Sequence, residues 1–160
     1  MAKKVKIKKT LVEQILTKAG IDHIGIQINA LEGELPTEYG RNQIFKTLAL
    51  LGDKTGPIIG IVPITEHLAE KKLAKVSGNK KVSMIPQKDL EKTTGYIHGA
   101  NNPVGIRQKH NYPIFIDQTA LDLDVMIVSA GEVGHSIIIH PRDLASFVKA
   151  DFADILEESK

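Results

Sequence analysis

Short apolar segments separated by polar turns recur along the chain, and their lengths are typical of β-strands. Strands are predicted where β-branched and aromatic residues cluster, over residues 21–28, 45–51, 57–62, 82–85, 113–117, 125–129 and 135–139. The segment from Gly52 to Gly56, between two of these strands, predicts a tight hairpin turn. The pattern therefore predicts a sheet that contains an antiparallel hairpin.

Helices are predicted from capping residues and from apolar positions that lie three or four residues apart. They are expected after Thr10, over residues 66–77, from Pro86 onward and from Pro141 onward. Thr10 is followed by Glu13, which is the spacing of a capping box. In the second helix Ala69, Leu73 and Val76 share one apolar face.

The order of these elements predicts one mixed α/β domain over residues 1–160. Strands alternate with helices, but the hairpin and the closely spaced later strands favour antiparallel pairing, unlike a doubly wound parallel sheet. No linker, internal repeat or low-complexity tract divides the sequence. We therefore expect a largely antiparallel sheet flanked by helices.

Composition excludes several classes of protein. Hydrophobic residues make up 42% and charged residues 25% of the chain, which is typical of a globular domain. Cysteine is absent, and this excludes disulfides, thiolate zinc sites and a cysteine nucleophile. No apolar run has the length of a membrane span, and the amino terminus lacks the apolar centre of a signal peptide. A cytoplasmic protein without a membrane partner is expected.

Charge is distributed unevenly, although the net charge is only +2. Residues 1–9 form a basic arm with five lysines, and residues 151–160 form an acidic tail. A basic arm of this kind is either a solvated terminus or a segment that attracts the phosphates of a nucleic acid. The sequence leaves both interpretations open.

Lys46 is the most unusual residue of the predicted strands. Side chains alternate between the two faces of a strand, so Lys46 shares its face with Leu48 and Leu50. An ammonium group on an apolar face is costly unless it has a partner or a function. The alternative is that Lys46 only begins the strand and extends its amine to water.

Three apparent motifs fail on inspection. A phosphate-binding loop needs glycine directly before its Lys-Thr pair, and Asp53 occupies that position. A hydrolase elbow needs glycine two residues before its serine, but Ile127 precedes Ser129 there. An odd separation would place His135 and His140 on opposite faces of a strand, which argues against a shared metal. No metal and no cofactor are therefore expected.

Two glycine-rich loops are better candidates for a binding site. They cover residues 94–105 and residues 129–134. Glycine lets backbone amides approach a ligand closely, and successive amides can hold an anion or a developing oxyanion. Taken singly, each loop could equally be an ordinary tight turn.

Together with the lysine strand, these loops carry a resemblance to a known family. The chain resembles the Cys-tRNA(Pro)/Cys-tRNA(Cys) deacylases of the YbaK/EbsC type, which are related to the editing domain of bacterial prolyl-tRNA synthetase. The resemblance runs from about residue 10 to about residue 154. Its carriers are residues 45–48, 94–96, Gly99, 103–105, 116–121 and 128–131.

The resemblance implies a sheet that curls toward a barrel and a catalytic role for Lys46. It also implies that two loops bind the substrate, through Gly99, Ala100, Asn101, Asn102, Pro103, Ser129, Ala130 and Gly131. The implied activity is removal of cysteine from tRNA(Pro), beside prolyl-tRNA synthetase as a partner. Cysteine's own thiol would attack the ester carbonyl, so the enzyme would supply orientation and charge stabilisation.

Several positions depart from the family pattern. The family loop usually has the form Gly-Gly-x-Ser-Pro, whereas this chain has Ala100 and Asn102 at the second and fourth positions. Ile28 stands where some members have tyrosine, and the helix before the lysine strand is shortened around Gly40. Three functions remain open: a cysteine-specific deacylase, a deacylase for alanine or another small residue, and a non-catalytic module that binds tRNA or a synthetase.

Overall fold

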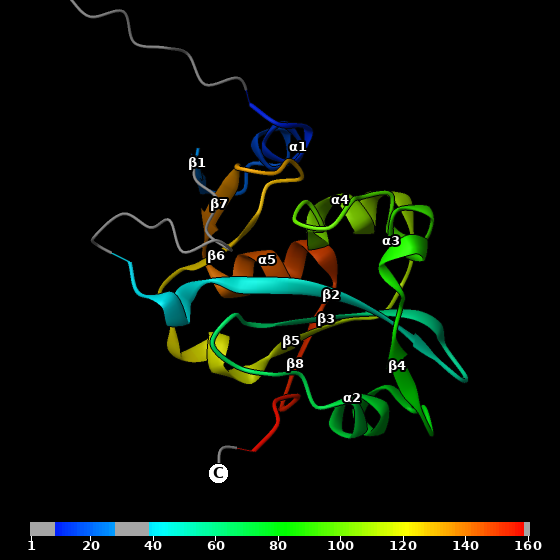
Figure 1. Cartoon of the computed structure of the whole chain (residues 1–160). Coiled ribbons are helices and arrows are strands. Elements are labelled where there is room, and N and C mark those ends of the chain that lie inside the picture. Colours follow the sequence, from blue (N-terminus) through cyan, green and yellow to red (C-terminus); the bar gives the residue numbers. More distant parts are fainter. Residues whose placement is uncertain (1–8, 28–38, 159–160) are drawn as a thin grey trace, which may run out of the picture.

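The structure is a computed structural model that describes residues 9–27 and 39–158 (Figure 1). The departure noted at Ile28 and residues 1–8 of the basic arm lie outside the described residues.

The described strands form two sheets. The smaller sheet has the order β1 (His23–Ile26), β7 (Ser136–Ile139) and β6 (Met126–Ser129). The larger sheet has the order β4 (Val82–Met84), β2 (Phe45–Gly52), β3 (Gly56–Pro63), β5 (Ile114–Asp117) and β8 (Asp151–Ala153).

Most neighbouring strands are antiparallel, as the sequence predicts. The smaller sheet is antiparallel throughout, and in the larger sheet β2 pairs antiparallel with both β3 and β4. The two remaining pairs, β3 with β5 and β5 with β8, are parallel. A bridge between Ile44 and Ile127 joins the sheets, but the described strands do not close into a barrel. The mixed α/β class is confirmed.

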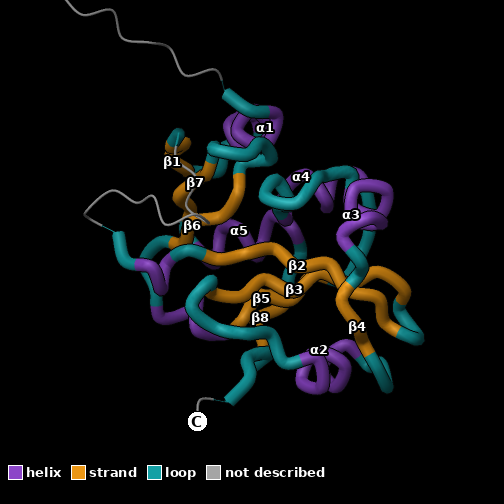
Figure 2. The backbone as a smooth tube through the Cα atoms, in the orientation of Figure 1, coloured by secondary structure: helices purple, strands orange, loops and turns teal. Residues whose placement is uncertain are grey.

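Five helices and two 3₁₀ turns connect the described strands (Figure 2). The helices are α1 (Leu11–Lys18), α2 (Glu70–Ser77), α3 (Gln87–Thr94), α4 (Pro103–Lys109) and α5 (Pro141–Val148). The 3₁₀ turns are η2 (Arg41–Gln43) and η3 (Gln118–Asp122). The predicted capping box is confirmed, because Thr10 Oγ1 accepts from the Glu13 amide and the Glu13 carboxylate accepts from the Thr10 amide.

Helix α2 is shorter than its sequence pattern predicts. It begins at Glu70, because residues 67–69 are extended and pair with the carboxy-terminal segment. The Ala69 amide donates to the Ile155 carbonyl at 2.8 Å, and the Glu157 amide donates to the His67 carbonyl at 2.8 Å. Val76 is 41% exposed, so the predicted apolar face of this helix is only partly buried.

Three further elements differ from the prediction. Pro86 is the N-cap residue of α3, one position before the first helical residue, whereas the sequence predicts it as the first residue of the helix. Helix α4 was not predicted, because its glycine-containing sequence lacks a helical apolar stripe and it begins only where Asn102 caps it. Strand β8 was not predicted either, because a strand of three residues is too short to show an alternation of apolar and polar positions. The predicted acidic tail thus contributes a strand to the sheet.

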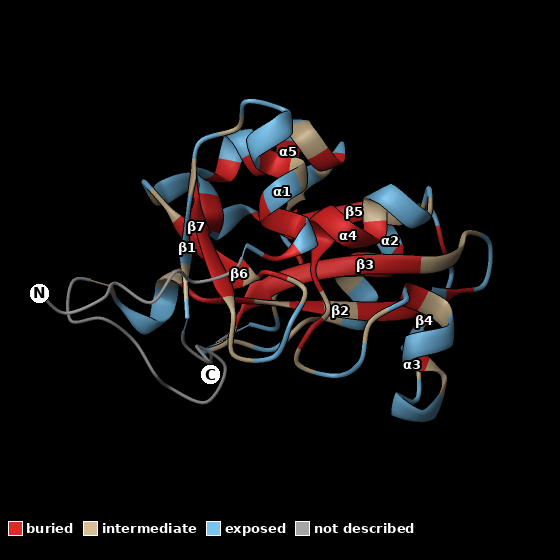
Figure 3. Ribbon diagram, turned by 90° about the horizontal axis from the view of Figure 1, so that it is seen from above, coloured by how far each residue is buried: buried red, intermediate tan, exposed pale blue. Residues whose placement is uncertain are grey.

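The larger sheet separates two apolar clusters. Figure 3 shows that most of β3, in the middle of this sheet, is buried. Phe45 and Ala49 of β2 face the larger cluster, which also includes residues of α1, α4, α5 and the smaller sheet. Leu50 of the same strand faces the smaller cluster, beneath α2. Consecutive residues of β2 therefore point toward two different environments, and this alternation positions the site described below.

The hairpin between β2 and β3 is confirmed, with Gly52 paired to Gly56. The Asn79 side chain closes the turn, because its Oδ1 accepts from the Lys54 and Thr55 amides at 2.8 and 3.0 Å. These amides bind a neighbouring side chain and are not arranged to hold phosphate. Within the described residues, no helix combines the length and the apolar character needed to cross a membrane.

Candidate active site at the open edge of strand β2

The first half of β2 lies at an open edge of the larger sheet. Strand β4 pairs with β2 only from Leu50 to Gly52. The two strands part at Ala49, whose carbonyl still accepts from the Ile85 amide at 3.1 Å. Because alternate residues of a strand direct their peptide groups to the same side, the peptide groups of Thr47 also face this edge. A ligand placed here could therefore approach the backbone of β2 as well as its side chains.

Two cavities meet at this edge. The first, which we call the edge cavity, has a volume of about 450 Å³ and is lined by residues 46–49 together with parts of β4, α3 and the loop after α3. The second, which we call the α2 groove, has a volume of about 720 Å³ and is lined by residues 67–71 and Glu157. Lys46, Leu48 and Met84 border both.

Lys46 lies on the boundary between the two cavities. Its side chain is half-buried and shares the strand face of Leu48 and Leu50, as the sequence predicts. No ion pair to Lys46 is found among the described residues. A half-buried ammonium without an acidic partner is expected to attract developing negative charge strongly, since water screens it incompletely.

Thr47 is a site residue that sequence analysis missed. It is 8% exposed, lines the edge cavity and has no hydrogen-bond partner for its Oγ1 among the described residues. Burying a hydroxyl without a partner costs roughly 1–3 kcal/mol. The only sequence signal was its place next to Lys46, because a threonine in a strand is otherwise unremarkable. Because Oγ1 itself is shielded from solvent, it could contact a ligand only after the Thr47 side chain turns toward the edge cavity.

The loop after α3 forms another part of the wall of the edge cavity. His98, Gly99 and Asn101 line the cavity, and Gly99 has φ of 90°, a conformation that favours glycine. The Thr94 hydroxyl, which is fully buried, donates to Asn101 Oδ1 at 2.8 Å. This bond orients the Asn101 amide and leaves its Nδ2 as a donor for a ligand. His98 was not among the predicted site residues.

Asn102 supports this loop from inside the protein. Its side chain is fully buried, its Oδ1 accepts from the Gly105 amide at 2.6 Å, and its Nδ2 donates to the Ala100 carbonyl at 3.0 Å. Asn102 is therefore the N-cap of α4, with Pro103 as the first helical residue. Serine is also a favoured N-cap, so asparagine can replace the serine of the family loop without changing its architecture. Ala100 and Pro103 are likewise buried.

Replacing Asn102 should therefore affect stability more than specificity. Asn102→Ala removes the cap of α4 and leaves the Ala100 carbonyl unpaired, and we expect a loss of about 2 kcal/mol or more in the free energy of unfolding. Asn102→Ser should retain most of that stability. Denaturant unfolding of both variants measures the difference, and equal stability of Asn102→Ala and the parent would contradict the assigned role.

The second predicted loop lies behind the first and does not line either cavity. Ser129 Oγ is 3.5 Å from the Gly99 carbonyl and accepts from the Gly131 amide at 3.2 Å. The Ala130 amide donates to the His135 carbonyl at 2.9 Å. Gly131 has φ of 93°, and an added Cβ there would lie 3.4 Å from Asn102 Nδ2. In this structure these residues position the Gly99 loop, and their own amides are already hydrogen-bonded.

The edge cavity combines cationic and hydrogen-bonding groups with apolar walls. Ile85 and Leu90 lie among the apolar residues of the wall, while Lys46, Thr47 and Asn101 provide donors. The described residues that line it include no carboxylate, serine or cysteine, and the described residues contain no group able to hold a metal ion. This arrangement can orient an ester and stabilise an oxyanion, but it supplies no obvious nucleophile of its own.

Ionisable groups with shifted pKa values lie away from the edge cavity. Backbone hydrogen bonds, led by that from Lys81, hold the pKa of Asp53 below its usual range at the hairpin. Desolvation lowers the pKa of Arg107, whose Nε donates to the Val148 carbonyl at 2.6 Å. These shifts accompany structural contacts and do not mark the site.

The chain is similar in sequence and in fold to known proteins. A protein named "Putative Cys-tRNA(Pro)/Cys-tRNA(Cys) deacylase EbsC" from Enterococcus faecalis is 42% identical over 134 residues, which cover 84% of this chain and 78% of that protein. The crystal structure of "a putative trans-editing enzyme for prolyl tRNA synthetase" has a TM-score of 0.74 at 21% identity, covering 92% of this chain and 95% of that one.

A third relative supports the fold alone. The crystal structure of "hypothetical protein APE2540" has a TM-score of 0.80 at 21% identity and covers 91% of this chain and 99% of that chain. The family model described as "Aminoacyl-tRNA editing domain" matches residues 34–147, which include the open edge of β2 and both loops. The chain belongs to the aminoacyl-tRNA editing domain family.

Proposed function

We propose that this protein is a trans-acting aminoacyl-tRNA deacylase that removes cysteine wrongly attached to tRNA(Pro). The observation that carries the proposal is the half-buried Lys46, without an acidic partner among the described residues, at the mouth of a cavity whose described lining includes no carboxylate, serine or cysteine. Such a site suits a substrate that brings its own nucleophile. The name of the Enterococcus faecalis relative supports cysteine as the amino acid.

The proposed reaction uses the thiol of the cysteine being removed. Its sulfur attacks the carbonyl carbon of the ester, and a C–S bond forms as the C–O bond to the terminal ribose breaks. The thiol proton ends on the ribose hydroxyl that leaves, and the amino acid leaves as a four-membered thiolactone. Lys46 stabilises the negative charge that develops on the carbonyl oxygen.

Thr47 and the Gly99 loop are proposed to orient the aminoacyl group. Thr47 and Asn101 both line the edge cavity, so the Asn101 Nδ2, together with a Thr47 hydroxyl turned toward the cavity, can hold the polar atoms of a small amino acid. Leu90 and Ile85 provide apolar surface for its side chain. Holding the thiol and carbonyl in a reactive arrangement accounts for much of the expected acceleration.

Hydrolysis of Ala-tRNA is a second candidate function, and His98 favours it. Its imidazole lines the same cavity and could hold a water molecule near the ester. Alanine has no side-chain nucleophile, so this route requires water. A purely tRNA-binding module is the third possibility, and it would show affinity without turnover.

One panel of substrates separates these functions. The purified protein is incubated with Cys-tRNA(Pro), Cys-tRNA(Cys), Ala-tRNA(Pro) and Pro-tRNA(Pro), and the remaining charged tRNA is measured over time. We expect rapid loss of both cysteinyl esters and slow loss of the other two. Preference for Ala-tRNA(Pro) would support the second function, whereas no loss of any ester would contradict deacylase activity.

Thr47→Val provides a test in which activity and stability change in different directions. Valine has nearly the same shape but no hydroxyl, so kcat/KM for Cys-tRNA(Pro) should fall about tenfold if that hydroxyl binds the substrate. Stability should stay equal or rise, because a buried unpaired hydroxyl is removed. Thr47→Ser, which keeps the hydroxyl, is the matched control. An active and equally stable valine variant would exclude this contact.

Association with prolyl-tRNA synthetase belongs to the same proposal. A deacylase for tRNA(Pro) receives its substrate from that synthetase, and the proposed setting is therefore the compartment where translation occurs. The solved relative described as a trans-editing enzyme for prolyl-tRNA synthetase supports this partner.

A further inference from the structure

We infer that the α2 groove binds the 3′-terminal nucleotides of the tRNA while the edge cavity holds the amino acid, an assignment that rests on the proposed function. The substrate ester joins an amino acid to a ribose. If Lys46 acts at that ester, the two parts of the substrate must extend to opposite sides of it. The two cavities meet at Lys46 and share Leu48 and Met84 as their boundary.

Size and enclosure agree with this division. The edge cavity, at about 450 Å³, is the smaller of the two and has the more apolar wall. Both volumes lie within the general range of small-molecule sites, and the α2 groove, at about 720 Å³, has the more room for a nucleotide. A small amino acid would be bound loosely in the groove, and a nucleotide joined to a tRNA chain needs the wider opening.

The wall of the groove is held in place by contacts from two distant parts of the chain. Residues 67–69 pair with residues 155–157 through the Leu68–Leu156 bridge and the two 2.8 Å hydrogen bonds described above. Leu68 rests directly on β3, because an added Cβ on Gly60 would lie 2.5 Å from Leu68 Cδ1. The groove is therefore formed before a ligand arrives, which lowers the entropic cost of binding.

The side chains of the groove suit a nucleoside better than a bare phosphate. Glu70 and Glu157 are acceptors for ribose hydroxyls and for the exocyclic amine of adenine, and both would repel an isolated anion. The exposed imidazole of His67 offers a surface on which a base can stack. Both carboxylates together with Lys46 and Lys71 leave the groove nearly neutral, unlike the lysine-rich path that a phosphate backbone prefers.

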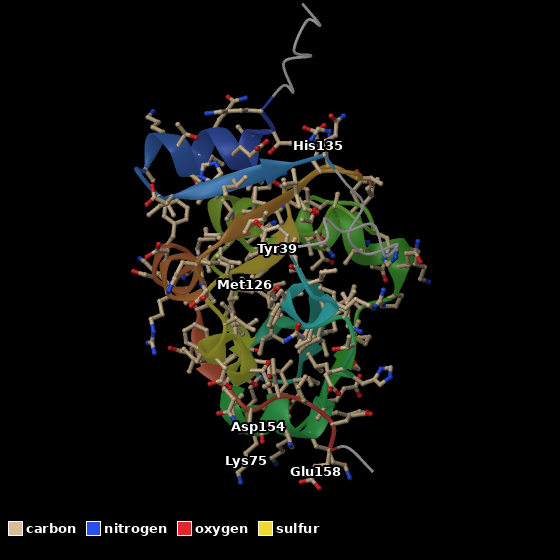
Figure 4. The ribbon with its side chains drawn as sticks, turned by 90° about the vertical axis from the view of Figure 1, so that its left-hand side faces the viewer. Tyr39, Lys75, Met126, His135, Asp154 and Glu158 are labelled. Carbon is tan, nitrogen blue, oxygen red and sulfur yellow. The ribbon has the colours of Figure 1, made fainter. Side chains whose placement is uncertain are left out.

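The cationic surface proposed for the backbone of the preceding nucleotides begins at Lys71, which lines the groove, and continues along α2 to Lys75. Lys71 and Lys75 are exposed and lie four residues apart, so they share one face of α2. Lys72 does not add a free charge to this surface, because it forms an ion pair of 3.0 Å with Asp154. The hydrogen bond from Lys72 lowers the pKa of that carboxyl. Figure 4 shows Lys75 and Asp154 at the same end of the molecule.

Binding of the uncharged RNA trinucleotide CCA tests this assignment without relying on catalysis. The labelled full-length protein is titrated with CCA, and backbone amide resonances are followed by NMR. We expect shifts at residues 67–71 and at Glu157, with smaller changes in the Gly99 loop. The double variant His67→Ala/Lys71→Ala should weaken CCA binding at least tenfold, whereas Lys80→Ala, which removes an exposed lysine outside both cavities, should not.

Kinetics with charged tRNA provide the second readout. The double variant should raise KM for Cys-tRNA(Pro) and for Ala-tRNA(Pro) by the same factor, because the nucleotide part is common to both. Shifts confined to the Gly99 loop, or unchanged CCA affinity in the double variant, would overturn the assignment. An inactive protein that still binds CCA in the groove would contradict the proposed function and leave this assignment standing.

Discussion

Lys46→Ala is expected to lower the rate of Cys-tRNA(Pro) deacylation by roughly a hundredfold or more, the usual effect of removing one transition-state donor. The expected loss is large because Lys46 is half-buried at the boundary of the two cavities and has no described acidic partner that already neutralises it. Single-turnover kinetics with saturating enzyme measure the chemical step directly.

Stability provides the control for this variant. Lys46 makes no described ion pair, so its removal should leave the melting temperature nearly unchanged. Lys54→Ala, in the hairpin at the far end of the same strand pair, removes one charge outside both cavities and should retain full activity. A folded Lys46→Ala protein with undiminished activity would remove the basis of the proposed function.

Methylation of the substrate thiol is expected to abolish turnover, because the described lining of the edge cavity offers no carboxylate, serine or cysteine to replace it. S-methylcysteinyl-tRNA(Pro) should still bind, since the tRNA part is unchanged. With the unmodified substrate, the first released product should be the thiolactone, which mass spectrometry can detect after rapid quenching. Ser-tRNA should react slowly, because a hydroxyl is a much weaker nucleophile than a thiol near neutral pH.

The alternative chemistry has a distinct signature. If Ala-tRNA(Pro) is deacylated as fast as Cys-tRNA(Pro), the reaction must use water, and methylation of the thiol should then have little effect. His98→Ala would be the informative variant in that case, because its imidazole is a candidate in the cavity wall for holding a water molecule. Loss of Ala-tRNA hydrolysis in that variant would identify the base.

Local sequence signals were sufficient for most of the elements around the site. The capping box at Thr10, the hairpin from Gly52 to Gly56 and the helix beginning at Pro141 follow from contacts within a few residues. Helix α2 was predicted too long because residues 67–69 pair with residues 155–157. Such a pairing between distant segments leaves no periodic signal in either one.

The family motifs also have structural reasons that the sequence did not reveal. Asp117 is buried, and its oxygens accept from the Thr119 and Ile155 amides at 3.0 Å, so it anchors η3 and the carboxy-terminal segment. Gly105 has no Cβ, which makes room for the ring of Tyr96. These residues keep the walls of the site in place and do not face the edge cavity.

Sequence by itself determined the alternation that places Lys46 on one face of β2 and Thr47 on the other, because side-chain direction in a strand depends only on position. It also indicated the glycine loop around Gly99, which requires a positive φ. Only the tertiary structure decided that β4 stops pairing at Leu50 and leaves an open edge. That edge, the unpaired Thr47 hydroxyl and the two cavities meeting at Lys46 arise from contacts between segments far apart in the chain, which no local pattern encodes.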